Sequence, residues 1–114
     1  MKKKILLLLM VVAPCASAYQ WSGYVKIEKI LTGYKEGFLL FKTTGNHVNP
    51  GSCSNTGYYS IEEKNADVDK ALSLLLSAQL GDRKIKVAAD GHRCGTVGIQ
   101  HLENQISVSR LLID

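Results

Sequence analysis

The sequence predicts a mainly β domain with one helix, built as a small antiparallel barrel of five or six strands. Three observations lead to this prediction. Short segments of alternating apolar and polar residues recur along the chain, separated by turn-forming residues. Only the segment near residues 65–80 has strong helical periodicity. Two cysteines remain once an N-terminal leader is set aside, and we expect them to form one disulfide.

The first 18 residues have the three parts of a secretory signal peptide. Lys2–Lys4 form a basic start, Ile5–Ala13 an apolar run, and Ala16–Ala18 a small-x-small cleavage site. The apolar run is shorter than the roughly 20 residues that span a bilayer, so we expect no membrane insertion. The mature protein is expected to begin at Tyr19 and to work in the periplasm or outside the cell.

Removal of the leader changes the charge of the protein. The whole chain has 14 Lys and Arg and 10 Asp and Glu, and three of the basic residues lie in Lys2–Lys4, which leaves 11 − 10 = +1. A nucleic-acid-binding domain is expected to keep a clear basic excess. We therefore predict no nucleic-acid partner.

The cysteines predict one disulfide and no metal site. Cys15 leaves with the leader, and Pro14 directly before it disfavours lipidation there. Cys53 and Cys94 then meet an oxidising compartment, where closing a loop of about 42 residues should contribute about 4 kcal/mol of stability in the chain-entropy model. His92 stands near Cys94, but neither CxxC nor HxxxH spacing supports metal binding. We predict no cofactor.

The first half of the mature domain predicts a hairpin followed by an irregular loop. Val25 and Ile27 alternate with charged residues, and Phe38–Phe41 is typical of a buried strand. Residues 45–57 are rich in Gly, Asn and Ser and predict a loop that carries Cys53. A short strand is expected at residues 58–61.

The helix is expected between Asn65 and Leu80. Asn65 or Asp67 can cap its start and Gly81 can end it. The predicted buried face is apolar and consists of Val68, Ala71, Leu72, Leu75, Leu76 and Ala78.

The last third of the chain predicts three more strands. Alternating apolar residues place them at residues 84–89, 96–102 and 106–113, and the loop at residues 90–95 carries Cys94. One helix among so many strands excludes a doubly wound α/β fold. A partly open barrel of the oligonucleotide/oligosaccharide-binding (OB) type would bury the helix stripe and protect the strand edges. A helix packed over an antiparallel sheet is the alternative. In either case residues 19–114 form a single domain.

No motif with the spacing of a catalytic site is present. The sequence lacks GxSxG, HExxH and a phosphate-binding GxxxxGK[ST]. The acid pair Glu62-Glu63 would point to opposite faces of a strand. We therefore predict a protein that is not an enzyme.

Aromatic residues favour binding instead. Exposed Tyr and Trp can stack on sugars or anchor a protein partner, although Trp21 near the start is also typical of a core residue. Tyr58 and Tyr59 are adjacent on a strand, so both cannot be buried. The disulfide would bring His92 and Arg93 close to this strand, unless they are simply polar residues of a hairpin tip. The predicted ligand surface therefore consists of Asn55, Tyr58, Tyr59, His92 and Arg93.

With this layout the chain resembles the B subunits of bacterial AB-type toxins, in the style of the subtilase-cytotoxin and pertussis-like subunits. The similar part runs from Tyr58 to Leu112. The chain is also similar to short uncharacterised secreted proteins of Gram-negative bacteria, through Trp21-Ser22-Gly23 and the Asn49–Cys53 loop. The toxin resemblance implies a glycan-binding barrel that assembles into a homo-oligomeric ring, but it transfers no sugar-contacting residue.

Together these observations predict a secreted, non-enzymatic binding module whose partner is a glycan or a protein. The alternative is a periplasmic or secreted inhibitor or accessory protein that acts on a partner enzyme.

Overall fold

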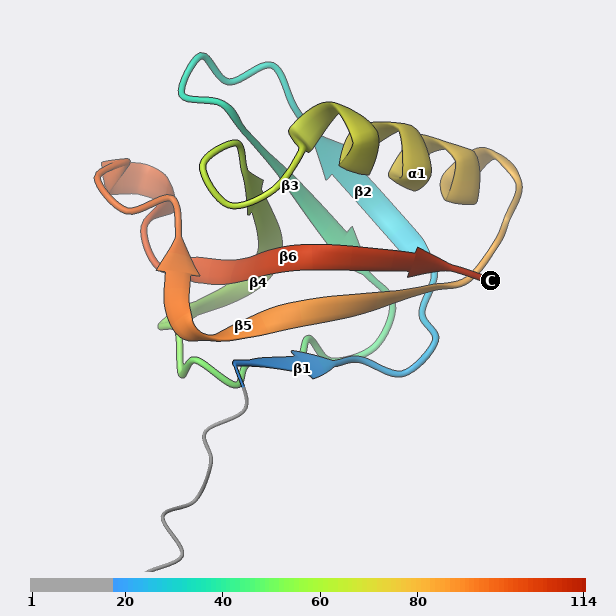
Figure 1. Cartoon of the computed structure of the whole chain (residues 1–114), viewed down its shortest axis with the longest axis horizontal. Coiled ribbons are helices and arrows are strands. Elements are labelled where there is room, and N and C mark those ends of the chain that lie inside the picture. Colours follow the sequence, from blue (N-terminus) through green and yellow to red (C-terminus); the bar gives the residue numbers. More distant parts are fainter. Residues whose placement is uncertain (1–17) are drawn as a thin grey trace, which may run out of the picture.

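The computed structural model describes residues 18–114 and folds them into one six-stranded sheet, one α-helix and one short 3-10 helix (Figure 1). The mainly β fold with one helix is thus confirmed. The predicted signal peptide lies, apart from Ala18, outside the described residues. The elements in chain order are β1 (Tyr19–Trp21), β2 (Ile27–Leu31), β3 (Phe38–Thr43), β4 (Asn55–Glu62), α1 (Val68–Leu80), β5 (Ile85–Gly95), η1 (Gln100–Leu102) and β6 (Gln105–Ile113).

The sheet has the order β1-β5-β6-β4-β3-β2 and is not closed into a barrel. The expected partly open barrel of the OB type is therefore not confirmed. Neighbouring strands are antiparallel except β4 and β6, which are parallel and pair at Tyr59–Ser60 with Ile106–Ser107. The prediction of a wholly antiparallel sheet was therefore wrong at this pair. The sequence could not reveal it, because pairing between strands this far apart in the chain leaves no local pattern.

The two end strands of the sheet are consecutive in the chain. Between them, Val25 and Ile85 exchange two backbone hydrogen bonds of 2.8 and 2.9 Å, and Thr44 N donates to Lys26 O at 2.8 Å. Residues 19–31 therefore run first along β5 and then along β3. Strands β1 and β2 follow one another along this path, so they are not paired with each other.

The core lies between the sheet and helix α1. The Asp67 carboxylate accepts a hydrogen bond from Lys70 N at 3.0 Å and caps the helix, which ends at Gly81 as expected. Leu75 and Ala78 are buried, whereas Leu76, predicted to be covered, is exposed. The buried sheet residues that pack in this core are Leu39, Phe41, Tyr59, Ile61, Ile85, Val87, Ala89, Ile106 and Val108.

One expected strand is absent from the described residues. Residues 96–102 alternate in hydrophobicity, yet they form a loop and the helix η1. Thr96 and Gly98 have φ angles of 56° and 90°, which interrupt an extended chain. The Thr96 hydroxyl hydrogen-bonds to Leu102 O and closes the loop. Strand β5 is longer than expected and continues to Gly95.

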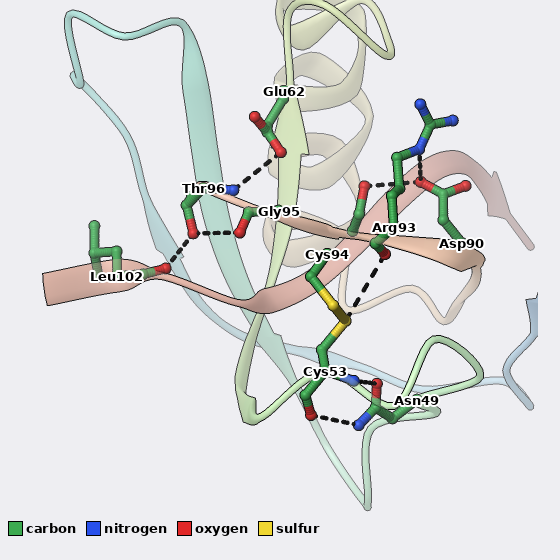
Figure 2. Close-up of a disulfide and its surroundings, with 10 residues drawn as sticks. Asn49, Cys53, Glu62, Asp90, Arg93, Cys94, Gly95, Thr96 and Leu102 are labelled. Carbon is green, nitrogen blue, oxygen red and sulfur yellow. Dashed lines mark hydrogen bonds and ion pairs between the residues drawn. A yellow bond between two sulfur atoms is a disulfide. The ribbon is translucent and has the colours of Figure 1, made fainter. Parts of the chain in front are cut away.

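The predicted disulfide between Cys53 and Cys94 is confirmed, with a Cα–Cα distance of 5.7 Å (Figure 2). Asn49 holds the Cys53 side of the bridge in place. Its side-chain amide donates to Cys53 O and its side-chain oxygen accepts from Cys53 N, both at 2.9 Å. The bridge therefore ties an organised loop to the end of β5.

We expect the double variant Cys53→Ala/Cys94→Ala to lose about 4 kcal/mol of unfolding free energy, because the unfolded chain regains the entropy that the bridge removes. Urea unfolding measures the loss. Reductant should destabilise the wild-type protein by a similar amount and leave the double variant unchanged. A reductant effect on the double variant would contradict this explanation.

Candidate functional site

Tyr59 is a core residue, which corrects its assignment to the ligand surface. It is 1% exposed, its ring stacks on His47 at 4.1 Å, and its hydroxyl accepts a hydrogen bond from Val48 N at 2.8 Å. Tyr58 is half-buried on the opposite face of β4, as alternation along a strand requires. Only Tyr58 of this pair remains available to a ligand.

The Arg93 side chain is bound by other side chains of the same domain (Figure 2). Its Nε lies 3.1 Å from Asp90 Oδ2, and its Nη1 donates to Asn65 Oδ1 at 2.7 Å. Asp90 is buried and also accepts a hydrogen bond from the Ser107 hydroxyl at 2.7 Å. A buried carboxylate requires such partners. Arg93 therefore compensates a buried charge.

The remaining predicted residues turn toward different neighbours. Asn55 accepts a hydrogen bond from Gly57 N at 3.3 Å within its own turn. His92 is exposed, and its Nδ1 lies 3.3 Å from Ala18 O at the start of β1. The disulfide joins the Cys53 loop to the end of β5, where Cys53 Sγ lies 3.8 Å from Arg93 O. These side chains do not converge on one pocket.

A different surface gathers exposed aromatic and basic side chains. Tyr19 and Trp21 are each 38% exposed and Tyr24 is 50% exposed. The rings of Tyr19 and Trp21 meet edge to face at 6.2 Å. The Arg110 guanidinium lies 5.3 Å from the centre of the Tyr19 ring, and Lys86 Nζ lies 4.5 Å from that of Tyr24. We call Tyr19, Trp21, Tyr24, Lys86 and Arg110 the aromatic face.

Strand pairing explains why Trp21, Lys86 and Arg110 share one side of the sheet, and Tyr24 joins them through its contact with Lys86. Trp21 pairs with Ala88, which pairs with Arg110, and directly paired residues point to the same side. Lys86 lies two positions from Ala88 and therefore on that side too. Ala88 is fully buried, because the larger side chains beside it close over its methyl group.

The sequence contained a partial signal for this face. Tyr19 and Trp21 have the period of two typical of a strand, directly after the predicted cleavage site. Trp21 was nevertheless also compatible with a core position. Its exposure depends on which segment covers it, and the partner strand β5 begins more than sixty positions later in the chain.

Two adjoining hollows lie elsewhere, beside the β2–β3 turn: one faces the start of α1 and the other the loop between β5 and β6. They measure about 670 and 690 Å³ and share Gly37, Phe38 and Glu63. The rings of Tyr34 and Phe38 stack at 4.3 Å beside them. The acidic residues that line the two hollows are Glu36, Glu62, Glu63, Asp67 and Asp69.

Among residues 18–114, no group of three or more His, Cys, Asp or Glu side chains is arranged to hold a metal ion. In the same part of the chain, no helix combines the length and apolar character needed to cross a membrane.

His47 is neutral in the folded protein. Its Nδ1 donates to Thr56 O at 2.8 Å, and its Nε2 accepts from Thr43 N at 3.3 Å, which only a neutral ring can do. Burial lowers the pKa of His47 below its ordinary value, and the contact with Thr56 O opposes this effect only in part. The folded protein therefore binds this proton less tightly than the unfolded chain does.

We expect the His47 contribution to stability to be complete above about pH 6.5, the ordinary histidine pKa, and to be lost as the pH falls below it. Urea unfolding between pH 8 and pH 5 measures this loss. His47→Gln should flatten that part of the pH profile, and His92→Gln should leave it unchanged. An unaltered profile in His47→Gln would assign the effect to another group.

Comparison with known proteins yields no relative for this chain: no protein-family model, curated protein or solved structure matches it.

Proposed function

We propose that the chain is an exported, non-catalytic binding module that holds glycans on its aromatic face. The exposed cluster of Tyr19, Trp21 and Tyr24 carries this proposal. Sugar rings have apolar C–H faces, and large aromatic side chains offer them apolar area at low entropic cost.

The aromatic face is supported by a well-ordered backbone. Ser22 is buried next to Trp21, its N donates to Val87 O at 2.8 Å, and its hydroxyl accepts from Val87 N at 2.9 Å. These bonds fix the strand that carries Tyr19 and Trp21 against β5. A ring that is already in position loses less freedom when it binds, which favours affinity.

We further propose that the fold is a variant of the OB type. Three observations support this. Strands β4 and β6 are parallel. Residues 19–31 run along both β5 and β3, so β1 and β2 together act as one long strand. Counted in this way, α1 separates three strands from the β5–β6 hairpin. We also propose that the chain is related to the B subunits of AB-type toxins and, like them, assembles into a ring.

An inhibitor or accessory protein is the second candidate. The loop between β5 and β6 favours it, because Val97 at its tip is 63% exposed and Gly98 follows it directly. A protruding loop with an exposed apolar residue can enter the cleft of a partner enzyme. Copurification with an enzyme, without glycan binding, would support this candidate.

We expect Trp21→Ala to weaken glycan binding by about 30-fold, which corresponds to the roughly 2 kcal/mol typical of an aromatic hot spot. A glycan array identifies the ligand, and calorimetry then measures its affinity. Tyr24→Ala should also weaken binding. Tyr34→Ala is the matched aromatic control, because its ring stacks on Phe38 away from this face.

Loss of binding in Tyr58→Ala, with Trp21→Ala unaffected, would move the site to β4. Thermal unfolding of each variant separates lost binding from lost folding.

The predicted ring is tested by native mass spectrometry of the exported protein. The toxin resemblance leads us to expect a species of five subunits with the disulfide intact. A monomer or dimer would contradict the ring and leave a free-standing module.

A further inference from the structure

We infer that the ligand of the aromatic face is an acidic saccharide, whose carboxylate or sulfate group is bound by Arg110 and Lys86. This inference rests on the proposed function, because it adds charge recognition to a face that would bind sugar rings. The shared chemistry is a negatively charged oxygen group attached to a sugar ring.

The two cations lie beside the rings that would hold the sugar. Arg110 lies over Tyr19 and Lys86 over Tyr24, at 5.3 and 4.5 Å. A cation over an aromatic ring is attracted to it and is held in place. A charged group on a sugar stacked against Trp21 would therefore find two positioned positive charges next to its ring.

Both charges lack an acidic partner in the described part of the chain. The ion pairs among residues 18–114 engage other cations, namely Lys26, Lys42, Lys64, Lys70 and Arg93. Asp90 pairs with Tyr19 in the sheet register, but its carboxylate is buried and already bound by Arg93 and Ser107. The positive charge of the aromatic face is therefore left for a ligand.

Most acidic side chains of the two hollows lie away from the aromatic face. The hollows lie beside the β2–β3 turn, whereas β1 runs along the opposite side of the fold (Figure 1). Asp67 is the exception, because it also lines a smaller pocket together with Arg110.

Arg83 and Lys84 directly precede β5 and are exposed. Asp82 and Asp114 lie beside these two residues, and Asp82 forms an ion pair with Lys26. Lys86 and Arg110 take part in no such pair among residues 18–114, which favours an anionic ligand at the aromatic face.

The residue types suit such a group. An arginine guanidinium can present two parallel N–H groups to a carboxylate or sulfate, and lysine adds a compact charge. Aromatic rings supply the apolar contact for the sugar itself. A neutral sugar would use only the aromatic rings and not the two cations.

Four probes test the inference at 150 mM NaCl: heparin, heparin stripped of its sulfates, dextran and single-stranded oligothymidylate. Biolayer interferometry gives the Kd for each. We expect heparin to bind at least tenfold more tightly than dextran. Arg110→Gln/Lys86→Gln should weaken heparin binding at least tenfold and leave dextran binding unchanged. Arg83→Gln/Lys84→Gln, which removes the same charge beside the face, should change heparin binding less than threefold.

Binding of desulfated heparin with unchanged affinity would identify the carboxylate as the recognised group, and its loss would identify the sulfate. Either result supports the inference. Equal binding of dextran and heparin, both weakened by Trp21→Ala, would overturn the inference and leave the proposed function standing. Oligothymidylate binding as tight as heparin binding would also overturn it, because the face would then recognise any polyanion.

Unchanged heparin binding in Arg110→Gln/Lys86→Gln would overturn the inference directly. If Trp21→Ala affected no polysaccharide, the proposed function itself would fail. Thermal unfolding confirms that each variant is folded.

Discussion

Burial of the Asp90 carboxylate is the constraint on which the rest of the structure depends. Arg93 and Ser107 must bind it, because an unpaired charge in the interior is strongly destabilising. Residues 90–93 lie between the two stretches of β5 that pair with β6, at Ala89 with Val108 and at Cys94 with Ile106. The hydrogen bonds that the Asp90 carboxylate requires therefore fix where β5 separates from β6. Beyond this point, β5 brings Cys94 to Cys53.

Strand β5 consequently serves two parts of the molecule. Its first half pairs with both β1 and β6 and supports the aromatic face, while its last residues reach the disulfide. The two parts have different chemistry. The disulfide region has its polar side chains engaged by the protein itself, as Arg93 illustrates. The aromatic face has two cations that lie over aromatic rings and belong to none of the ion pairs among residues 18–114, and we therefore expect recognition there.

Local patterns predicted the features that depend on local physics. The Asp67 cap, the end of α1 at Gly81 and the disulfide follow from residue type, spacing and compartment. Period-two alternation found most strands but failed at residues 96–102, where the positive φ of Thr96 prevents a strand. It also could not decide which of Tyr58 and Tyr59 faces the core. That choice depends on the register of β4 with β3 and β6. In the same way, the exposure of Trp21 depends on its pairing with β5.

The aromatic face joins the beginning of the folded chain to its end. Tyr19 and Trp21 belong to the first strand, whereas Arg110 belongs to the last. Contacts between segments so distant in sequence form late, because a long loop must close before they are made. Chains that stop before β6 would lack Arg110 and the strand that pairs with β5 on the side away from β1. A complete aromatic face therefore requires that the last strand has been synthesised and paired.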